Sequence, residues 1–412
     1  MIWATLLHWY QPPGQIDEII HNVVNQSYDP TVSLLERFPD AHITLNINGC
    51  LTEQLGRLNP ELIERIKRLV EKGQIELVES AKYHPLLPLL PEHEIRRQIQ
   101  LNYETNSFFF GDLYAPKGFF PPELAYGNRV AKIVSELGYE WLILDEISLA
   151  GKLSQESYDV LYAHEVYPNL KLFFNDRQIA HMLRAKRNLN AKEFWQQIKN
   201  RTKSRYYLIT ANDGEVFGHH YHSREEILEV AFIDKDIQTL TLSEISQQYS
   251  TKPRSVKPLK ATWDTSEEDI RNNISFPLWW HENNEIQQFQ WQLAEIALRE
   301  YEQNPRPPED PGFIYTSSRN HLDRGLHSCH FWWASANPWW NPDIIVAGAT
   351  EIIRSIRGLP QISIETKKQA EEIYAKIIEL TWKWHWGGEA QKRMTEFDIN
   401  KKSLTDIEEK RQ

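Results

Sequence analysis

Two short stretches of the chain concentrate side chains that can do acid–base chemistry. Glu123 follows a Pro-Pro pair, where the backbone is stiff and poor at strand pairing, so its carboxylate is presented rigidly. Asp213 and Glu215 stand with His219 and His220 in a span of eight residues. Glycoside cleavage uses a pair of carboxylates, one as nucleophile or base and the other as acid. We therefore take Glu123 and Asp213 as the candidate catalytic pair.

The histidines beside Asp213 support a second interpretation. Metal-assisted hydrolases also gather Asp and His at the mouths of barrels, and His219, His220 and His222 could hold a metal together with Asp213. However, the sequence contains no H-E-x-x-H or other familiar ligand spacing. We therefore expect no metal and no cofactor.

Polar side chains also follow nearly every segment of the chain that has the pattern of a β-strand. In a parallel barrel the carboxyl ends of the strands share one face, which is where such folds place their chemistry. Any one of these residues could instead cap the following helix or loop. An end of the barrel that served only to stabilise the fold would not need so many carboxylates. The residues are His8, Asn48, Glu76, Glu79, Glu123, Asp145, Asn175, Asp176, Asp213 and Glu215.

The polar residues can meet only if strands and helices bring them together, and the hydrophobic pattern of the chain predicts such strands and helices. Short β-rich runs alternate with longer amphipathic segments, which predicts an α/β fold with a parallel sheet closed into a β/α barrel. The predicted strands are residues 2–7, 43–47, 75–78, 117–120, 141–144, 170–174 and 206–211. The predicted helices, with apolar residues at i, i+3 and i+4, are residues 16–37, 60–72, 92–109, 129–137, 191–201 and 224–232.

The pattern changes near residue 260, where long helical segments replace the alternation. We expect two domains, a catalytic β/α barrel over residues 1–260 and a helical domain over residues 261–412 that packs on the barrel mouth. The predicted helices of the second domain are residues 283–301, 343–356 and 365–383.

Composition excludes several other classes of protein. The 412 residues carry 46 basic and 57 acidic side chains, and a net charge of −11 repels nucleic acid and anionic lipid. No window approaches the ~20 apolar residues of a membrane helix, and the N-terminus lacks the features of a signal peptide. Two distant cysteines, Cys50 and Cys329, exclude a disulfide framework and suit a reducing cytoplasm. The sequence does not specify an oligomeric state.

Five motifs, taken in order, resemble those of glycoside hydrolase family 57. This family of retaining, α-glucan-active enzymes includes α-amylases, amylopullulanases, 4-α-glucanotransferases and branching enzymes. The first motif has two residues inserted between His8 and Gln11, and the fifth has Cys329 where some members carry Asp. The matching segments are residues 8–12, 73–85, 118–126, 212–219 and 328–335.

The resemblance carries expectations about the fold and the site. It implies an incomplete, seven-stranded β/α barrel beside a helical domain, with Glu123 as nucleophile and Asp213 as general acid/base. The residues that it places in the sugar site are His8, Gln11, Glu76, His84, Glu215 and His219. Three of them have plain structural alternatives: His8 as a hydrogen-bonded barrel histidine, Glu76 as a buried partner of Arg or Lys, and Glu215 as a helix cap.

The chain also has 15 Trp against 3 Met, and flat amphipathic rings often stack on sugars. We take Trp263, Trp332 and Trp333 as candidate sugar contacts, with packing between domains as the alternative. The expected activity is hydrolysis of α-1,4-glucans with retention, and an oligo- or polysaccharide α-glucan is the expected partner. The alternatives are a 4-α-glucanotransferase or branching enzyme, an inert glycan-binding relative, and a metal-dependent carbohydrate hydrolase.

Overall fold

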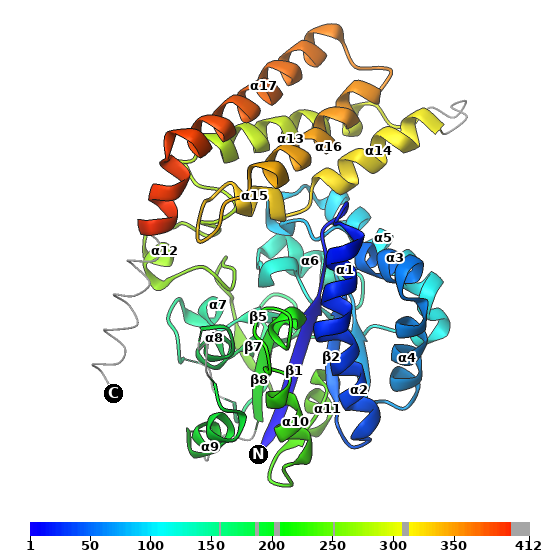
Figure 1. Ribbon diagram of the computed structural model, residues 1–412, viewed down its shortest axis with the longest axis vertical. Helices are drawn as coiled ribbons and strands as arrows, with labels where there is room; N and C mark the ends of the chain where they lie inside the picture. The colour runs from blue at the N-terminus through cyan, green and yellow to red at the C-terminus, as the bar shows by residue number, and fades with distance from the viewer. Residues whose placement is uncertain (156–157, 186–188, 202–206, 250–251, 307–312, 397–412) are drawn as a thin grey trace. The chain divides into compact units, whose positions relative to one another are not determined.

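The computed structural model describes residues 1–155, 158–185, 189–201, 207–249, 252–306 and 313–396. The chain divides into two compact units, Met1–Ser275 and Phe276–Gln412 (Figure 1). The division falls later than the boundary that we expected near residue 260. Residues 261–275, which include Trp263, therefore belong to the first unit.

Parallel strands form the centre of the first unit (Figure 1). The strands are β1 (Ile2–Trp9), β2 (Ile43–Ile47), β3 (Ile75–Val78), β4 (Gly118–Phe119), β5 (Trp141–Asp145), β6 (Tyr162–His164), β7 (Lys171–Asn175), β8 (Tyr207–Asp213), β9 (Gln238–Thr239) and β10 (Arg254–Val256). The predicted strands are all found, except that Tyr206, the first residue of the last one, lies outside the described residues. The sequence analysis missed β6, β9 and β10, which are only two or three residues long.

Two runs of parallel strands, β3-β2-β1-β8 and β7-β5-β4, make up the barrel. They meet at one end where Glu79 bridges Phe119 in parallel, its N–H donating to the Gly118 oxygen at 2.9 Å. At the other end the Asp176 N–H donates to the Ile209 oxygen at 3.0 Å. The ring therefore runs β1-β2-β3-β4-β5-β7-β8, which confirms the predicted seven-stranded β/α barrel. β6 pairs antiparallel with the start of β7 and lies outside the ring.

Helices cover the outside of the barrel and connect successive strands. The long predicted segment 16–37 is interrupted by a π-helical turn, η1 (Val24–Tyr28), between α1 (Asp17–Val23) and α2 (Asp29–Arg37). The other helices of this unit are α3 (Gly49–Leu58), α4 (Pro60–Glu71), α5 (Glu92–Phe110), α6 (Asn128–Glu136), α7 (Ile147–Ala150), α8 (Arg177–Ala185), α9 (Ala191–Arg201), α10 (Glu226–Ile233), α11 (Leu242–Gln248) and α12 (Glu267–Arg271). The short 3₁₀ turns are η2 (Leu87–Leu89), η3 (Gly111–Leu113), η4 (Pro122–Leu124) and η5 (Gly214–Val216).

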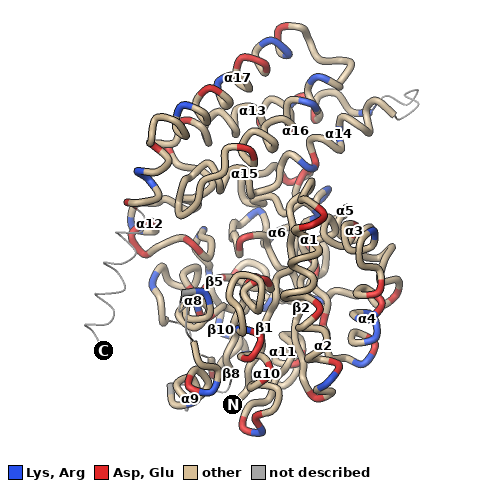
Figure 2. The backbone as a smooth tube through the Cα atoms, in the orientation of Figure 1, with Lys and Arg blue, Asp and Glu red and all other residues tan. Residues whose placement is uncertain are grey.

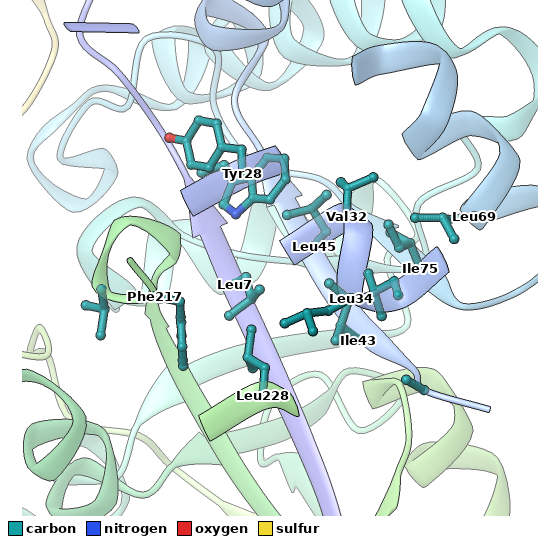
Figure 3. Close-up of a cluster of buried hydrophobic side chains, with 14 of the residues drawn as sticks. Leu7, Tyr28, Val32, Leu34, Ile43, Leu45, Leu69, Ile75, Phe217 and Leu228 are labelled. Carbon is teal, nitrogen blue, oxygen red and sulfur yellow. The ribbon is translucent and has the colours of Figure 1, made fainter. Parts of the chain in front are cut away.

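Alternation along the strands separates a packing face from a polar one. Leu7 of β1 and Ile43 and Leu45 of β2 point outward and are fully buried against the helices, where Figure 3 shows them with Val32 and Leu228. Each such side chain contributes about 1.5–3 kcal/mol by leaving water. The residues between them, such as His8 and Asn46, point to the inside of the barrel. The outer face thus holds the fold together and leaves the inner face available for chemistry.

The second unit is a set of packed helices: α13 (Glu285–Gln303), α14 (Phe313–Gly325), α15 (Cys329–Trp333), α16 (Pro342–Gly358) and α17 (Ile364–Gly387). α16 packs on α13, α14, α15 and α17. Ile345, Ile352 and Ile356 of α16 are fully buried. The helical C-terminal region predicted from the sequence is therefore confirmed.

The charged side chains lie mainly on the outer helices, where both signs are mixed. Acidic and basic residues are interspersed along α4 and α17 (Figure 2). Arg65 of α4, for example, pairs with both Asp29 and Glu36 of α2. Among the residues that the structure describes, no helix is long and apolar enough to cross a lipid bilayer.

Candidate active site

The loop after β4 presents Glu123 in an unusual backbone conformation. Glu123 (φ 63°) and Leu124 (φ 48°) both have backbone angles in the left-handed region, which residues other than glycine rarely adopt. Each such residue costs on the order of 1 kcal/mol or more and persists only where its surroundings impose it. Here the Leu124 N–H donates to the Pro121 oxygen at 2.9 Å, and the Glu123 carbonyl accepts from the N–H of Trp263 at 3.2 Å. Backbone strain at a carboxylate is a feature of functional sites.

The carboxylate of Glu123 accepts a hydrogen bond on one oxygen and has a histidine close to the other. The Trp263 indole N–H donates to Oε2 at 3.0 Å, and Nδ1 of His84 lies 3.6 Å from Oε1. The Glu123 side chain is 13% exposed, so it is sheltered but still reachable from solvent. A carboxylate fixed in this way can attack a neighbouring electrophilic carbon without first having to be oriented.

A stack of aromatic rings lines the inner face beside Glu123. The His8 ring stacks on His84 with centroids 4.8 Å apart, and on Phe120 at 4.6 Å. Tyr10 also stacks on His84, at 4.2 Å, and its ring centroid lies 6.0 Å from that of His8. His8 donates from Nδ1 to the Asn46 oxygen at 2.6 Å. Burial lowers the pKa of His8 although the Asp213 charge raises it, so this histidine is neutral near pH 7.

Asp213 is the last residue of β8 and lies beside His8. The two are register partners in the parallel β1–β8 pair, so their side chains leave the same face of the sheet. The Asp213 side chain accepts no hydrogen bond from any other residue that the structure describes, and the residue is partly exposed. A carboxylate of this kind is free to give and take a proton.

Glu215 is the buried neighbour of Asp213. Its Oε1 accepts hydrogen bonds from the Tyr28 hydroxyl and from Nε2 of Gln11, the latter at 2.8 Å. Burial first, and then the charge of Asp213, raise its pKa to about 8. The Glu215 carboxyl therefore carries a proton at neutral pH, which avoids placing two negative charges side by side.

The π-helical turn η1 and one glycine fix the backbone of this loop. Ser27 of η1 donates to the Gly214 oxygen at 2.7 Å, next to the Tyr28 bond on Glu215. A side chain at Gly214 would put its Cβ 2.2 Å from the Trp9 ring, which stacks on Tyr28 at 4.1 Å. Only glycine allows the loop to approach so closely. π-Helical turns occur often at functional sites, and this one positions the loop that carries Asp213.

The structure brings together most of the residues that we expected in the site. Contacts link His8, His84, Glu123 and Trp263 to one another, and Gln11 with Glu215 forms the second group around Asp213. His219 lies on the margin of the second group, where its Nδ1 is 2.7 Å from the Gln26 side-chain oxygen in an exposed position.

Glu76 lies apart from these groups, which corrects its expected place in the site. It is the second residue of β3, near the amino end of the barrel, and Ser243 of α11 donates its N–H to Glu76 at 3.1 Å. The Thr44 hydroxyl donates to the same oxygen at 3.3 Å. Glu76 is half-buried, and its partners are hydroxyl and amide groups rather than the Arg or Lys of the alternative interpretation. Three residues later, Glu79 stands at the opposite end of the strand.

Trp332 and Trp333 belong to α15 in the second unit. Their rings meet edge to face with centroids 5.3 Å apart, and Trp339 packs against both. Their contact with sugar stays a prediction.

Several residues of the site were missed from the sequence. Tyr28 lies within a predicted helix and gives no sign that it reaches Glu215, 187 positions away. Asn46 was placed inside a strand, and its role follows only from the register with His8. The alternation along β2, which puts an asparagine on the inner face, was the one signal available for Asn46. Within the described parts of the chain, no three His, Cys, Asp or Glu residues are grouped so that they could hold a metal ion.

The geometry provides two carboxylates in different environments. Glu123 is oriented by hydrogen bonding, and Asp213 is unbonded beside a protonated acid. This difference suits a reaction in which one carboxylate acts as a nucleophile and the other transfers a proton.

Comparison with known proteins identifies the family. Residues 5–258 match the model of glycosyl hydrolase family 57. An α-amylase of Pyrococcus horikoshii is 25% identical over 272 residues, which cover 63% of this chain and 42% of the amylase. The chain thus spans less than half of that relative.

Two solved structures share the fold. The 4-α-glucanotransferase of Thermococcus litoralis aligns with a TM-score of 0.71 at 17% identity, over 87% of this chain and 60% of that one. A GH57 branching enzyme of Thermococcus kodakaraensis aligns with a TM-score of 0.64 at 16% identity, over 90% of this chain and 94% of that one. Since the family model covers more than half of the sequence, this protein belongs to glycosyl hydrolase family 57.

Proposed function

We propose that the protein cleaves α-1,4-glucans with retention of configuration, by double displacement. A carboxylate oxygen of Glu123 attacks the anomeric carbon while the bond from that carbon to the leaving oxygen breaks, and Asp213 gives its proton to this oxygen. Water or a sugar hydroxyl then attacks the glycosyl-enzyme, Glu123 leaves as a carboxylate, and the proton of the attacking group returns to Asp213. The observation that carries the proposal is the Glu123 carboxylate, which accepts a hydrogen bond from Trp263, lies close to His84 and sits on a strained backbone.

We assign the donor sugar to the space between the two carboxylates. His8, Gln11, His84, Glu215 and Trp263 supply donors, acceptors and ring faces there, as sugar hydroxyls and C–H faces require. We propose His219, Trp332 and Trp333 as further sugar contacts. The partner is an oligo- or polysaccharide α-glucan.

Hydrolysis is the first choice and transfer to a second sugar is the alternative. The similarity to an enzyme named α-amylase supports hydrolysis, and the fold shared with a 4-α-glucanotransferase and a branching enzyme keeps transfer open. The two outcomes differ only in whether water or a sugar hydroxyl reaches the glycosyl-enzyme. We also propose a reducing, cytoplasmic location, which the two distant cysteines support.

Incubation with maltoheptaose tests both the activity and its outcome. The protein and its Glu123→Gln variant are incubated with the sugar, and the products are separated by length. Shorter sugars with rising reducing ends support hydrolysis, whereas a ladder that extends beyond seven glucose units supports transfer. The variant should leave the sugar unchanged. If the protein itself changes no α-glucan, the proposed activity is wrong.

A further inference from the structure

A buried ion pair lies at the carboxyl ends of β5 and β7. Arg177, the first residue of α8, places Nε 2.9 Å and Nη2 2.5 Å from Oδ1 of Asp145. The two side chains are only 6% and 0% exposed. A buried ion pair is weak evidence for stability, because desolvating both charges offsets their attraction. We therefore look for a role of the Arg177–Asp145 pair other than stabilising the fold.

The same guanidinium also binds the turn that carries Trp263. Nη1 of Arg177 donates to the Thr265 carbonyl at 2.6 Å, and Nη2 donates to the Thr262 carbonyl at 2.9 Å. Within the turn, the Thr262 N–H donates to the Thr265 hydroxyl at 2.8 Å. Trp263 thus lies between two anchored residues. Its own backbone and indole N–H groups both donate to Glu123.

Asp145 extends the connection toward the other catalytic carboxylate. Its Oδ2 accepts from the Asn175 side-chain amide at 3.3 Å. The oxygen of the Asn175 amide accepts from the N–H of Ala211 at 2.8 Å, two residues before Asp213. One ion pair is therefore linked by hydrogen bonds to the turn that holds Glu123 and to the strand that ends at Asp213.

We propose that Arg177 is a positioning residue that acts on Glu123 through Trp263; this inference rests on the proposed function. Arg177 fixes the 262–265 turn, and the turn directs the Trp263 indole N–H at Oε2 of Glu123. Arginine suits this task because its planar guanidinium donates in three directions at once. A lysine keeps the charge beside Asp145 but cannot reach both carbonyls in the same geometry.

The first test uses Arg177→Lys, which preserves a cation beside Asp145 and so favours folding. Amide hydrogen exchange of the peptide that contains residues 261–265 should become faster in the variant, because the Thr262 and Thr265 carbonyls lose their donors. Unchanged exchange in this peptide would overturn the proposal. This arm does not depend on any activity on α-glucans.

The second test measures turnover of an α-maltosyl fluoride, whose leaving group needs little help from an acid. The Arg177→Lys variant should lose roughly 10²-fold in kcat with a much smaller change in KM, because Glu123 is misplaced while the sugar contacts other than Trp263 are retained. In a Trp263→Phe background, Arg177→Lys should cause a much smaller further loss, since the indole bond is already absent and only the backbone N–H bond of residue 263 remains to be disturbed. Losses that multiply in the double variant, or a kcat equal to that of the wild type, would contradict a role through Trp263.

A matched control comes from Gln74, a buried amide that donates to the carbonyls of Leu35, Phe38 and Ala41 at 2.8, 3.0 and 3.3 Å. Gln74→Met removes a comparable set of backbone contacts away from the site, so it should lower the melting temperature and leave kcat unchanged. If Gln74→Met lowers kcat as much as Arg177→Lys does, the effect of Arg177 is general destabilisation and the proposal fails. A wild-type protein that turns over no fluoride rejects the proposed function, and hydrogen exchange then decides the role of Arg177 alone.

Discussion

Trp263 donates to Glu123 twice, from its indole N–H to Oε2 at 3.0 Å and from its backbone N–H to the carbonyl oxygen at 3.2 Å. The two bonds fix the backbone and the side chain of the carboxylate with a single residue. Trp263 lies 140 positions further along the chain, after the last strand of the barrel. The conformation of the Glu123 loop therefore depends on a segment that follows the completed ring.

Replacing Trp263 with phenylalanine keeps a ring and removes the N–H donor. A hydrogen bond to a charged group is worth about 1.5–3 kcal/mol, so kcat should fall roughly 10- to 150-fold. Initial rates on an α-maltosyl fluoride would measure this. Trp195→Phe is the control, because the Trp195 indole N–H donates to the Ile227 carbonyl at 2.8 Å on the outer side of the barrel. If both variants show the same loss, the indole bond has no particular role at Glu123.

The roles of the two carboxylates can be separated by the stereochemistry of rescue. In Glu123→Ala, azide can occupy the vacated space and attack an α-glycosyl fluoride directly, so the product should be the β-azide. In Asp213→Ala, the glycosyl-enzyme still forms and azide replaces water in the second step, so the product should be the α-azide. NMR of the anomeric proton distinguishes the two. A β-azide from the Asp213 variant would mean that the roles are reversed.

The raised pKa of Glu215 predicts that the free energy of unfolding falls as pH rises from 4.5 to 8. Its pKa rises from a usual 4.5 to about 8 in the folded state, because burial and Asp213 disfavour the charge. The folded state therefore binds the proton more tightly than the unfolded state does. The stabilising effect is complete below pH 4.5 and is lost as pH rises through 8. Within this window, each step of one pH unit removes up to about 1.4 kcal/mol from the free energy of unfolding.

Glu215→Gln imitates the protonated side chain at every pH, so its free energy of unfolding should depend less on pH between 4.5 and 8. Urea unfolding across this range measures the effect. Glu79→Gln is the matched variant, because burial raises the pKa of Glu79 to about 7. The pH dependence of stability that Glu79 contributes should therefore level off about one pH unit below that of Glu215. Equal pH dependence in wild type and Glu215→Gln would show that Glu215 is charged in the folded protein.

Gly214→Ala should destabilise the protein and impair activity. The new Cβ would lie 2.2 Å from the Trp9 ring, so the loop between Asp213 and Glu215 must shift. Such overpacking costs about 1–3 kcal/mol. Gly387→Ala is the control, because a Cβ there meets nothing within 4 Å. Thermal unfolding and kcat together test this, and an unchanged kcat in Gly214→Ala would show that the loop geometry is not critical.

The sequence predicted the barrel well because each strand in the ring is a short β-rich run bounded by turn residues or amphipathic helices. It located Glu123 and Asp213 because both lie near the carboxyl end of such a run. The sequence could not place Glu76 correctly, since a strand of four residues has charged groups near both of its ends and only pairing in three dimensions shows which end faces the site.

Residues whose role depends on distant contacts could not be found in the same way. Tyr28 lies in a segment predicted as an amphipathic helix, whose pattern accounts for it fully, and Arg177 begins α8, which the sequence analysis did not predict. Their partners are 187 and 85 to 88 positions away, respectively. Sequence pattern reports which face of an element is buried, but it does not report which carbonyl or carboxylate that face will meet.

The pairing of β1 with β8 has a consequence for how the protein becomes active. His8 and Asp213 are neighbours in register although they are 205 positions apart, so their contact closes a very long loop of chain. Contacts between such distant parts of a chain form slowly, because a long loop has to be closed first. During refolding, secondary structure should therefore return early, and enzyme activity should return only with the final, slow step of ring closure.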